Sequence, residues 1–484
     1  MTRNLFIVFW FLLGLQFCSS QQGEKDFKIS EYRNVGDDKV SIVLDFVGNL
    51  EPRKTVRFFA VGHRIDIKKH LENEQTFYES YKKYMDIIKP YFSRRYINFV
   101  VFEEHAGLPL IFFGERGKTA REQAKKAFEA SVYIFPKLSQ TISYYTKKFP
   151  DVSTLQGRQL FLALTDTTWR VFYNTFSSLA KEYGVYVASC QNTSYPAIEK
   201  KSSGDIEKFV DEVIQDRTFY YEATTSDVWN TCFIFSPDGQ IVHKTRKVNL
   251  VPSEKNDLQF SSGRYEELEV FRVPGTELDV CIAISLDAFV PDYIRILDEK
   301  GCDVLLQPDA NAGAWAGMGG LGYWQTYEWI VSTLGSIQTQ YYIGCTNPHV
   351  ALFLEGRERR CDFQKIQISW KKSILFNVNP MMTGNLFDTV FDGQTAITGR
   401  DGRARRNINY IGNPPIDEMK FNGELNFPEG GFIVLGPWSF DINNTLSLEE
   451  QQRIAREYQS SLSQGGQNEN KYISTVVGAD LSVQ

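Results

Sequence analysis

Short apolar segments that alternate with helical segments constrain the fold of this chain more than any other feature. Residues 97–102, 278–284 and 303–306 are mostly apolar, which is typical of strands covered on both faces. Between the last two, Pro291 begins a predicted helix, because its fixed φ suits a first helical turn. This strand, helix, strand order predicts a layered α/β protein. With 42% hydrophobic and 14% aromatic residues, the 484-residue chain can bury a large core.

Periodic apolar residues predict the remaining elements. Helices are expected at 72–89, across an Ala-rich region at 119–149, and in an aromatic-faced segment that stops at Gly184. Segments 232–235 and 240–244 flank a turn containing Pro and Gly and should form a hairpin. A helix capped by Ser447 is expected near the C-terminus. Further strands are expected at 55–61, 185–190, 431–435 and 473–477.

The chain is expected to divide into three parts. Residues 1–20 look like a secretory signal, in which Arg3 precedes an apolar stretch too short to span a bilayer, which takes about 20 residues. Residues 21–52 are charged and weakly patterned, and we expect an N-terminal extension there. Residues 53–484 then form one domain with a C-terminal strand, helix, strand tail. We therefore expect a secreted protein, extracellular or in the secretory-pathway lumen, with no membrane attachment after cleavage.

Six cysteines remain after the expected cleavage, and an exported chain can form disulfides. We expect Cys190 to pair with Cys232 and Cys345 with Cys361, with buried free thiols as an equal alternative.

Two kinds of modification signal are present. Asn192 and Asn443 each begin a glycosylation sequence, which would place both at the surface. The basic run at 403–406 is interpreted as a solvated turn, with cleavage by a proprotein convertase as the alternative.

Charge and motif content exclude several classes of function. With 53 Lys+Arg against 59 Asp+Glu, the net charge of −6 disfavours nucleic acid as a partner. The cysteines and histidines lack zinc-site spacing. A GxGxxG sequence at 317–322 does not directly follow a strand, and neither a P-loop nor a GxSxG elbow is present. We therefore expect neither a metal nor a cofactor.

Three polar residues stand at the ends of predicted strands or just past the hairpin, where α/β folds gather their sites. They are Glu104, Lys247 and Ser285. Each also has a purely structural interpretation: an exposed acidic strand end, a solvated basic edge and a helix N-cap, respectively.

Together these segments resemble the nitrilase, or carbon–nitrogen hydrolase, superfamily. The resemblance rests on a strand ending in Glu104, a Lys-x-Asn-Leu-x-Pro-x-Glu stretch at 247–254, and a strand followed by Ser285-x-Asp287, in that order. Segments 301–308, 344–347 and 392–397 are similar to later strands of the family, so the resemblance covers roughly 53–410.

The resemblance implies a four-layer α-β-β-α sandwich, usually a dimer through its helical face, acting on a non-peptide amide or nitrile. It assigns Glu104 as general base, Lys247 as stabiliser of developing negative charge, and Glu254 as a carboxylate that orients the site.

Ser285 departs from the family pattern, because the nucleophile there is a cysteine. A hydroxyl is several pKa units harder to deprotonate than a thiol of pKa about 8.5, so Glu104 alone should be a weak base for it. Cys281 cannot substitute, because four strand residues span about 13 Å. Two hypotheses follow: an amide hydrolase that uses Ser285, with a neutral Lys247 as base or with water activated by Glu104, or an inactive binding protein that keeps the pocket.

Overall fold

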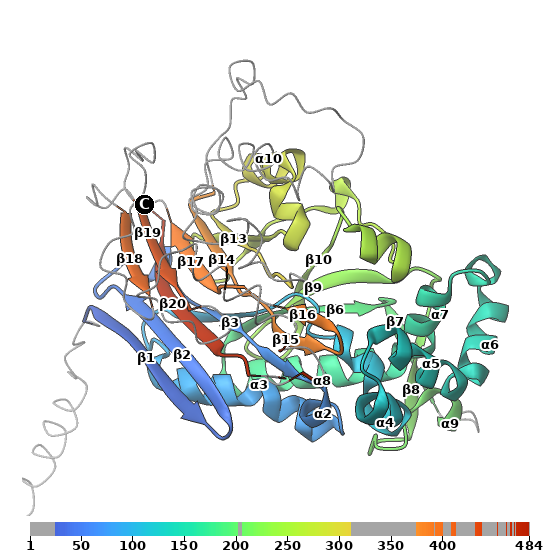
Figure 1. The fold of residues 1–484 in the computed structure, drawn as a ribbon. Coiled ribbons are helices and arrows are strands. Elements are labelled where there is room, and N and C mark those ends of the chain that lie inside the picture. The colour runs from blue at the N-terminus through green and yellow to red at the C-terminus, as the bar shows by residue number, and fades with distance from the viewer. Residues whose placement is uncertain are drawn as a thin grey trace, which may run out of the picture.

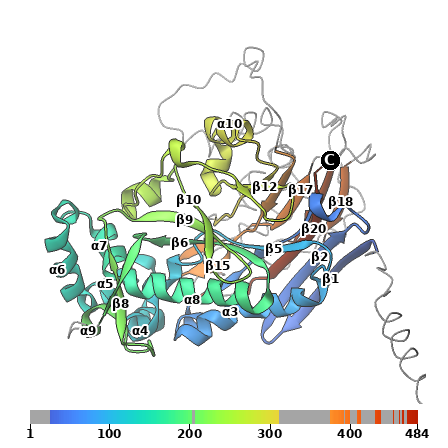
Figure 2. The same cartoon turned by 180° about the vertical axis from the view of Figure 1, so that it is seen from behind.

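The fold is seen in a computed structural model that describes residues 25–201, 206–310, 374–391, 393–399, 408–412, 431–437 and 471–483, with isolated residues between 453 and 469. Two large sheets occupy the middle of the molecule, with α10 on one side and α3 and α8 on the other (Figure 1). Seen from behind, helices α4 to α7 form one end of the molecule, and β1 and β2 form the other (Figure 2).

The larger sheet has eight strands in the described chain. Its central strands β3, β5 and β6 run parallel, as the apolar segments predicted. In spatial order the strands are β1 (Phe27–Val35), β2 (Asp38–Phe46), β20 (Ser474–Ser482), β3 (Thr55–Gly62), β5 (Ile97–Phe102), β6 (Tyr186–Thr193), β9 (Trp229–Phe235) and β10 (Ile241–Arg246).

The second sheet is mixed, with β12, β13 and β14 parallel. Its order is β11 (Phe271–Arg272), β12 (Asp279–Ile282), β13 (Val304–Leu306), β14 (Phe376–Asn379), β17 (Ala396–Gly399), β19 (Gly431–Leu435) and β18 (Ile408–Gly412). The smaller sheets are β16 (Thr389–Phe391), β15 (Thr383–Leu386) and β4 (Arg64–Asp66), and the pair β7 (Ala197–Lys201) and β8 (Phe219–Ala223).

The helices predicted at 72–89, across 119–149, before Gly184 and from Pro291 are present, the second as three separate helices, and the one expected after Ser447 lies outside the continuously described ranges. The α-helices of the described residues are α2 (Ile67–His70), α3 (Glu74–Ile88), α4 (Gly114–Gln123), α5 (Ala127–Lys137), α6 (Ser139–Lys148), α7 (Gln156–Ala163), α8 (Thr165–Tyr183), α9 (Ile206–Phe209) and α10 (Pro291–Glu299). Gly184 ends α8 with a left-handed φ of 64°, as predicted. None of the helices in the described ranges is long and apolar enough to cross a membrane.

Alternation along the strands builds the layers. In β5, Val100 and Phe102 pack into the cluster shared with helices α3 and α8, whereas Phe99 and Val101 pack between the two sheets. In β13, Leu305 packs with α10 on the far side of the second sheet. The order is therefore helix, sheet, sheet, helix, which confirms the predicted four-layer α-β-β-α sandwich.

The N-terminal boundary predicted at residue 53 is wrong. Within the expected extension 21–52, β1 and β2 form a hairpin, and β2 pairs in parallel with β20 near the C-terminus. Residues 40–46 are almost completely buried. The β1 strand is an exposed, polar edge, which hides its strand character in the sequence.

Two disulfides join described cysteines. Cys190–Cys232 links β6 to β9, as predicted. Cys281–Cys302 links β12 to the residues before β13, a pairing that was not among those expected from the sequence. The predicted partners Cys345 and Cys361 lie outside the described residues.

Candidate functional site

Glu104 lies just past the end of β5, where the chain leaves the strand. Its neighbour Glu103 faces helix α3 and accepts a 2.9 Å hydrogen bond from the Tyr81 hydroxyl. Glu104 instead faces Lys247, and it is only 1% exposed. The alternative of an exposed acidic strand end is therefore excluded.

Lys247 directly follows β10 and lies between two carboxylates. Its Nζ is 2.8 Å from Oε1 of Glu104 and 2.8 Å from Oε2 of Glu254, and all three side chains are 1% exposed. Burial opposes the charge, but Glu104 and Glu254 outweigh it and raise the pKa of Lys247 above its ordinary value. The ammonium therefore stays charged, which excludes a solvated basic edge and argues against a neutral Lys247 as base.

Asn230 of β9 bridges the two carboxylates. Its Nδ2 donates to Oε1 of Glu104 at 2.8 Å and to Oε1 of Glu254 at 2.9 Å. Glu254 also accepts a bond from the backbone N–H of Val251 at 3.0 Å. Charge-assisted bonds of this kind fix the carboxylates in place.

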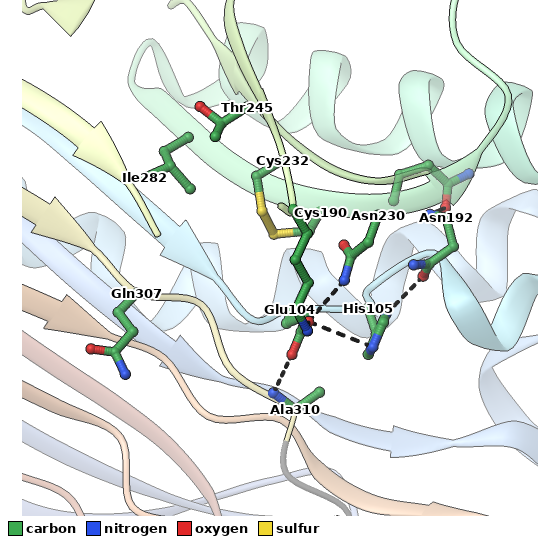
Figure 3. Close-up of a disulfide and its surroundings, with 12 residues drawn as sticks. Glu104, His105, Cys190, Asn192, Asn230, Cys232, Thr245, Ile282, Gln307 and Ala310 are labelled. Carbon is green, nitrogen blue, oxygen red and sulfur yellow. Dashed lines mark hydrogen bonds and ion pairs between the residues drawn. A yellow bond between two sulfur atoms is a disulfide. The ribbon is translucent and has the colours of Figure 1, made fainter. Parts of the chain in front are cut away.

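The disulfide between β6 and β9 lies beside this centre (Figure 3). Cys190 is paired with Cys232 in the ladder, and Asn192 is paired with Asn230 two residues further on. Because strand residues two apart share a face, the disulfide and the two asparagines lie on the same face of the sheet. The cross-link thus holds the two asparagines at a fixed separation.

His105, which directly follows Glu104, completes the cluster. Its Nδ1 is 3.0 Å from Oδ1 of Asn192, and its Nε2 is 3.6 Å from Oε1 of Glu104 and 3.6 Å from Oε1 of Glu254. His105 is 7% exposed and adopts a left-handed φ of 60°.

Ser285 begins a short 3-10 turn, Ser285–Phe289, after β12. It has a left-handed φ of 48°, is 7% exposed, and donates its backbone N–H to the carbonyl of Pro308 at 3.1 Å. A non-glycine residue in this region stores backbone strain. No side chain caps α10, so the N-cap interpretation of Ser285 is wrong.

Asp287 connects the Ser285 turn to the Lys247 segment. Its carboxylate accepts bonds from the backbone N–H groups of Val248 and Asn249, the latter at 2.8 Å, and from Nδ2 of Asn249 at 2.8 Å. Burial raises the pKa of Asp287 to about 7. The two sequence motifs are therefore joined by direct hydrogen bonds.

The segment after β13 is hydrogen-bonded to Glu104. The backbone N–H of Ala310 donates to Oε2 of Glu104 at 3.0 Å (Figure 3). The preceding Asp309 is fully buried, and burial, followed by the charge of Glu104, raises its pKa to about 7. The structure thus brings Glu104, Lys247 and Glu254 into direct contact, with Ser285 on segments bonded to both sides of that cluster.

Glu104, His105 and Glu254 offer ligand atoms within 4.8 Å of one another, a spacing that could hold a metal ion. Lys247 already provides a positive charge 2.8 Å from both carboxylates. A divalent cation there would meet the repulsion of this ammonium, so the donor set fits an ion-paired centre better.

The surface position predicted for Asn192, as a glycosylation acceptor, is wrong. Asn192 lies within β6, is 0% exposed and contacts His105. The acceptor pattern is local in sequence, whereas burial depends on the strands on both sides. Asn443, the basic run at 403–406 and the GxGxxG segment lie outside the described residues.

Sequence reasoning missed His105, Asn192, Asn230 and Asp309 as members of the site. For His105 the available signal was its position directly after Glu104. For Asn192 and Asn230 the available signal was their position in the sequence. Each stands two residues from a cysteine of the predicted Cys190–Cys232 pair, and so on the same face of its strand.

Comparison with known families gives a match over more than half of the chain. The family described as carbon-nitrogen hydrolase matches residues 114–405, which include Lys247, Glu254 and Ser285, whereas Glu104 lies before the matched range.

Curated relatives include the omega-amidases NIT2 of Xenopus tropicalis and Mus musculus, both 24% identical. The match with the first covers 34% of this chain and 62% of the relative, and with the second 32% and 57%. The chain thus spans less than two thirds of the length of these relatives.

Solved structures similar to this chain include an amidase from Nesterenkonia sp. (TM-score 0.35, 11% identity, 72% of this chain and 85% of that one). A carbon-nitrogen hydrolase from Helicobacter pylori has a TM-score of 0.40 and 12% identity, covering 72% and 83%.

Proposed function

Because this chain belongs to the carbon-nitrogen hydrolase family, we propose that it hydrolyses a small non-peptide amide through Ser285. Glu104 serves as general base, and the Lys247 ammonium stabilises the negative charge that develops on the carbonyl oxygen. Glu254 holds Lys247 in place from its other side. The amidase names of the curated relatives favour an amide over a nitrile.

The observation that carries this proposal is the buried Glu104–Lys247–Glu254 cluster. Burying charges costs more free energy than an apolar packing of the same volume, so such a cluster is a poor way to stabilise a fold. A fixed ammonium in a water-poor site is well suited to stabilise a developing oxyanion. The left-handed backbone of Ser285 is a second sign, since strain of this kind gathers at functional sites.

In the first half of the reaction, the Ser285 hydroxyl oxygen attacks the amide carbon while its proton passes to Glu104. The resulting oxyanion faces Lys247, which remains charged. Collapse breaks the carbon–nitrogen bond, and the proton leaves with ammonia. Water then attacks the acyl ester by the same route, releasing the acid and restoring Ser285.

We expect this reaction to be slow. Each pKa unit by which a hydroxyl exceeds a thiol costs about 1.4 kcal/mol in forming the nucleophile, which is a tenfold loss in rate.

The test is ammonia release from a panel of small primary amides, with intact-mass analysis for an acyl group on Ser285. We expect slow turnover by the native chain, none by S285A, and a gain of at least about 100-fold in S285C, given the easier ionisation of a thiol. Absence of ammonia and of adduct from both the native chain and S285C would refute the proposal.

A second candidate function is non-catalytic binding of a small amide in the same pocket. It is favoured by Glu104, whose two carboxylate oxygens already accept bonds from Lys247, Asn230 and Ala310. Each of those hydrogen bonds is weakened when the Glu104 carboxylate takes a proton, so these bonds oppose its use as a general base. Calorimetry would then detect amide binding of equal affinity in the native chain and S285C, with no turnover by either.

We also propose that the protein is exported, which the two disulfides support, because they persist in oxidising compartments. N-terminal sequencing of secreted protein should begin near Gln21. Association into a dimer stays a prediction.

A further inference from the structure

One ring nitrogen of His105 lies close to the carboxylates of Glu104 and Glu254, and Figure 3 shows the ring between Glu104 and Asn192. The carbonyl oxygen of Asn192 can only accept, so Nδ1 of His105, 3.0 Å away, is the N–H donor of the ring. In the neutral imidazole, Nε2 is then an acceptor. It lies 3.6 Å from one oxygen of Glu104 and 3.6 Å from one oxygen of Glu254. A proton on Nε2 converts repulsion at these two contacts into attraction.

The charged side chains around His105 favour one further positive charge on its ring. Glu104 and Glu254 bring two negative charges, and Lys247 supplies one positive charge. Asn192 of β6 faces the ring as a neutral group, and Asp309, whose pKa burial raises to about 7, interacts with the charge of Glu104. Glu104, Glu254 and Lys247 together carry a net charge of −1, which a proton on His105 cancels.

The backbone conformation and a hydrogen bond fix the position of the His105 ring beside the two carboxylates. A left-handed φ of 60° turns the His105 side chain away from the path of β5, and Asn192 fixes its orientation. Asn192 is in turn held opposite Asn230 by the neighbouring disulfide.

We propose that His105 is a positioning residue for the base, which relieves Glu104 of the proton it takes from Ser285. This inference rests on the proposed function. In acylation the Ser285 O–H bond breaks, its proton reaches Glu104 and moves on to Nε2 of His105, and the Ser285 oxygen bonds to the acyl carbon. When the carbon–nitrogen bond breaks, the proton returns through Glu104 to the departing ammonia. Hydrogen bonds that are long in an empty site commonly shorten when substrate binds.

The need for such a group follows from the serine nucleophile. An isolated imidazole holds a proton about two pKa units more firmly than an isolated glutamate, which corresponds to about 100-fold in the population of the deprotonated nucleophile. A thiol nucleophile ionises near neutral pH and has much less need of this help.

The test compares H105N in two backgrounds, the native Ser285 chain and S285C. Asparagine tolerates a left-handed backbone, and its side-chain N–H can replace the bond from Nδ1 to Asn192, so this variant removes the proton-accepting nitrogen and keeps the local structure. H105A, which also loses that bond, is the control for structural damage, and thermal unfolding checks both variants.

We expect H105N to lower kcat by about 100-fold in the Ser285 chain, with little change in KM, and by less than about tenfold in S285C. An acidic limb of the kcat–pH profile that depends on His105 should also disappear from the Ser285 chain. An equal loss in both backgrounds, or no loss in either, overturns the inference.

Failure of the proposed function is distinguishable from failure of this inference. If neither background releases ammonia, the proposed function fails, and the imidazole is then followed directly by NMR of labelled histidine between pH 5 and 8. Protonation at Nε2, with Nδ1 protonated throughout, supports the proton-accepting part of the inference. A ring that does not change its protonation, or that loses its proton from Nδ1, overturns it.

Discussion

Replacement of Lys247 by methionine tests the electrostatics of the site most directly. The change keeps the length and apolar stem of the side chain but removes an ammonium that lies 2.8 Å from each of two carboxylates. Removing one partner of a buried ion pair typically costs about 3–5 kcal/mol, because the remaining charge has no compensation. Against a total stability of about 5–15 kcal/mol, this is a large loss.

The same variant should reverse the pH dependence of this part of the fold. Burial pushes the pKa of Glu254 up, but Lys247 and then His105 hold it below its ordinary value. In the native chain, Glu254 therefore contributes stability above the unfolded pKa of about 4.3, and this contribution is lost as pH falls through the lower folded pKa. Without Lys247, burial dominates and the folded pKa of Glu254 rises above the unfolded value. The variant then gains stability as pH falls.

The measurement is urea unfolding at pH 8 and pH 5, followed by circular dichroism. The deficit of K247M should be about 3–5 kcal/mol at pH 8. It should shrink by about 1.4 kcal/mol for each pH unit in which only the folded state holds the extra proton. Lys118, about half exposed and 3.8 Å from Glu115, gives the matched control, because K118M should change stability by less than about 0.5 kcal/mol. A K247M deficit that is below 1 kcal/mol, or equal at both pH values, would contradict the reasoning.

Two further predictions concern the supports of the site. Replacing Cys190 and Cys232 by serine opens a loop with a sequence separation of 42 residues and should cost about 4 kcal/mol in urea unfolding. This double variant should also have a lower kcat. The same change at Cys281 and Cys302, separated by 21 residues, should cost about 3 kcal/mol and leave kcat unchanged. Equal kcat values for the two double variants would contradict the role given to the Cys190–Cys232 disulfide. The folded pKa of Asp287, raised to about 7 by burial, lies above the unfolded value, so its contribution to stability should fall as pH rises from about 4 to 7. D287N should lack this slope, and an unchanged stability–pH curve would show that Asp287 is not the group responsible.

Local patterns predicted much of the fold because they depend on near neighbours along the chain. The apolar run of β5, the stop at Gly184 and the hairpin of β9 and β10 are each encoded within a few residues. The hairpin of β1 and β2 was missed, because its edge strand is polar and its partner β20 is far away in the sequence.

The candidate site shows the same division. Glu104, Lys247 and Glu254 could be named from motifs, and the structure places them in one buried cluster. His105 and Asn192 could not be named from motifs. The left-handed backbone of His105 sets the direction of its side chain, and strand pairing buries Asn192. The surface position predicted for Asn192 failed for this reason.

The amino-acid sequence by itself determined the local tendency of most segments to form strands or helices and which chemical groups are present, including the hydroxyl of Ser285. Only the tertiary structure decided which of these groups meet, which are removed from water, and therefore which charges are held. The physical reason is the sequence distance over which each effect acts, because backbone propensity and side-chain alternation depend on only a few neighbouring residues. Desolvation and ion pairing at this site depend on segments as distant as Glu104 and Lys247, which only the packing of the two sheets brings within 2.8 Å.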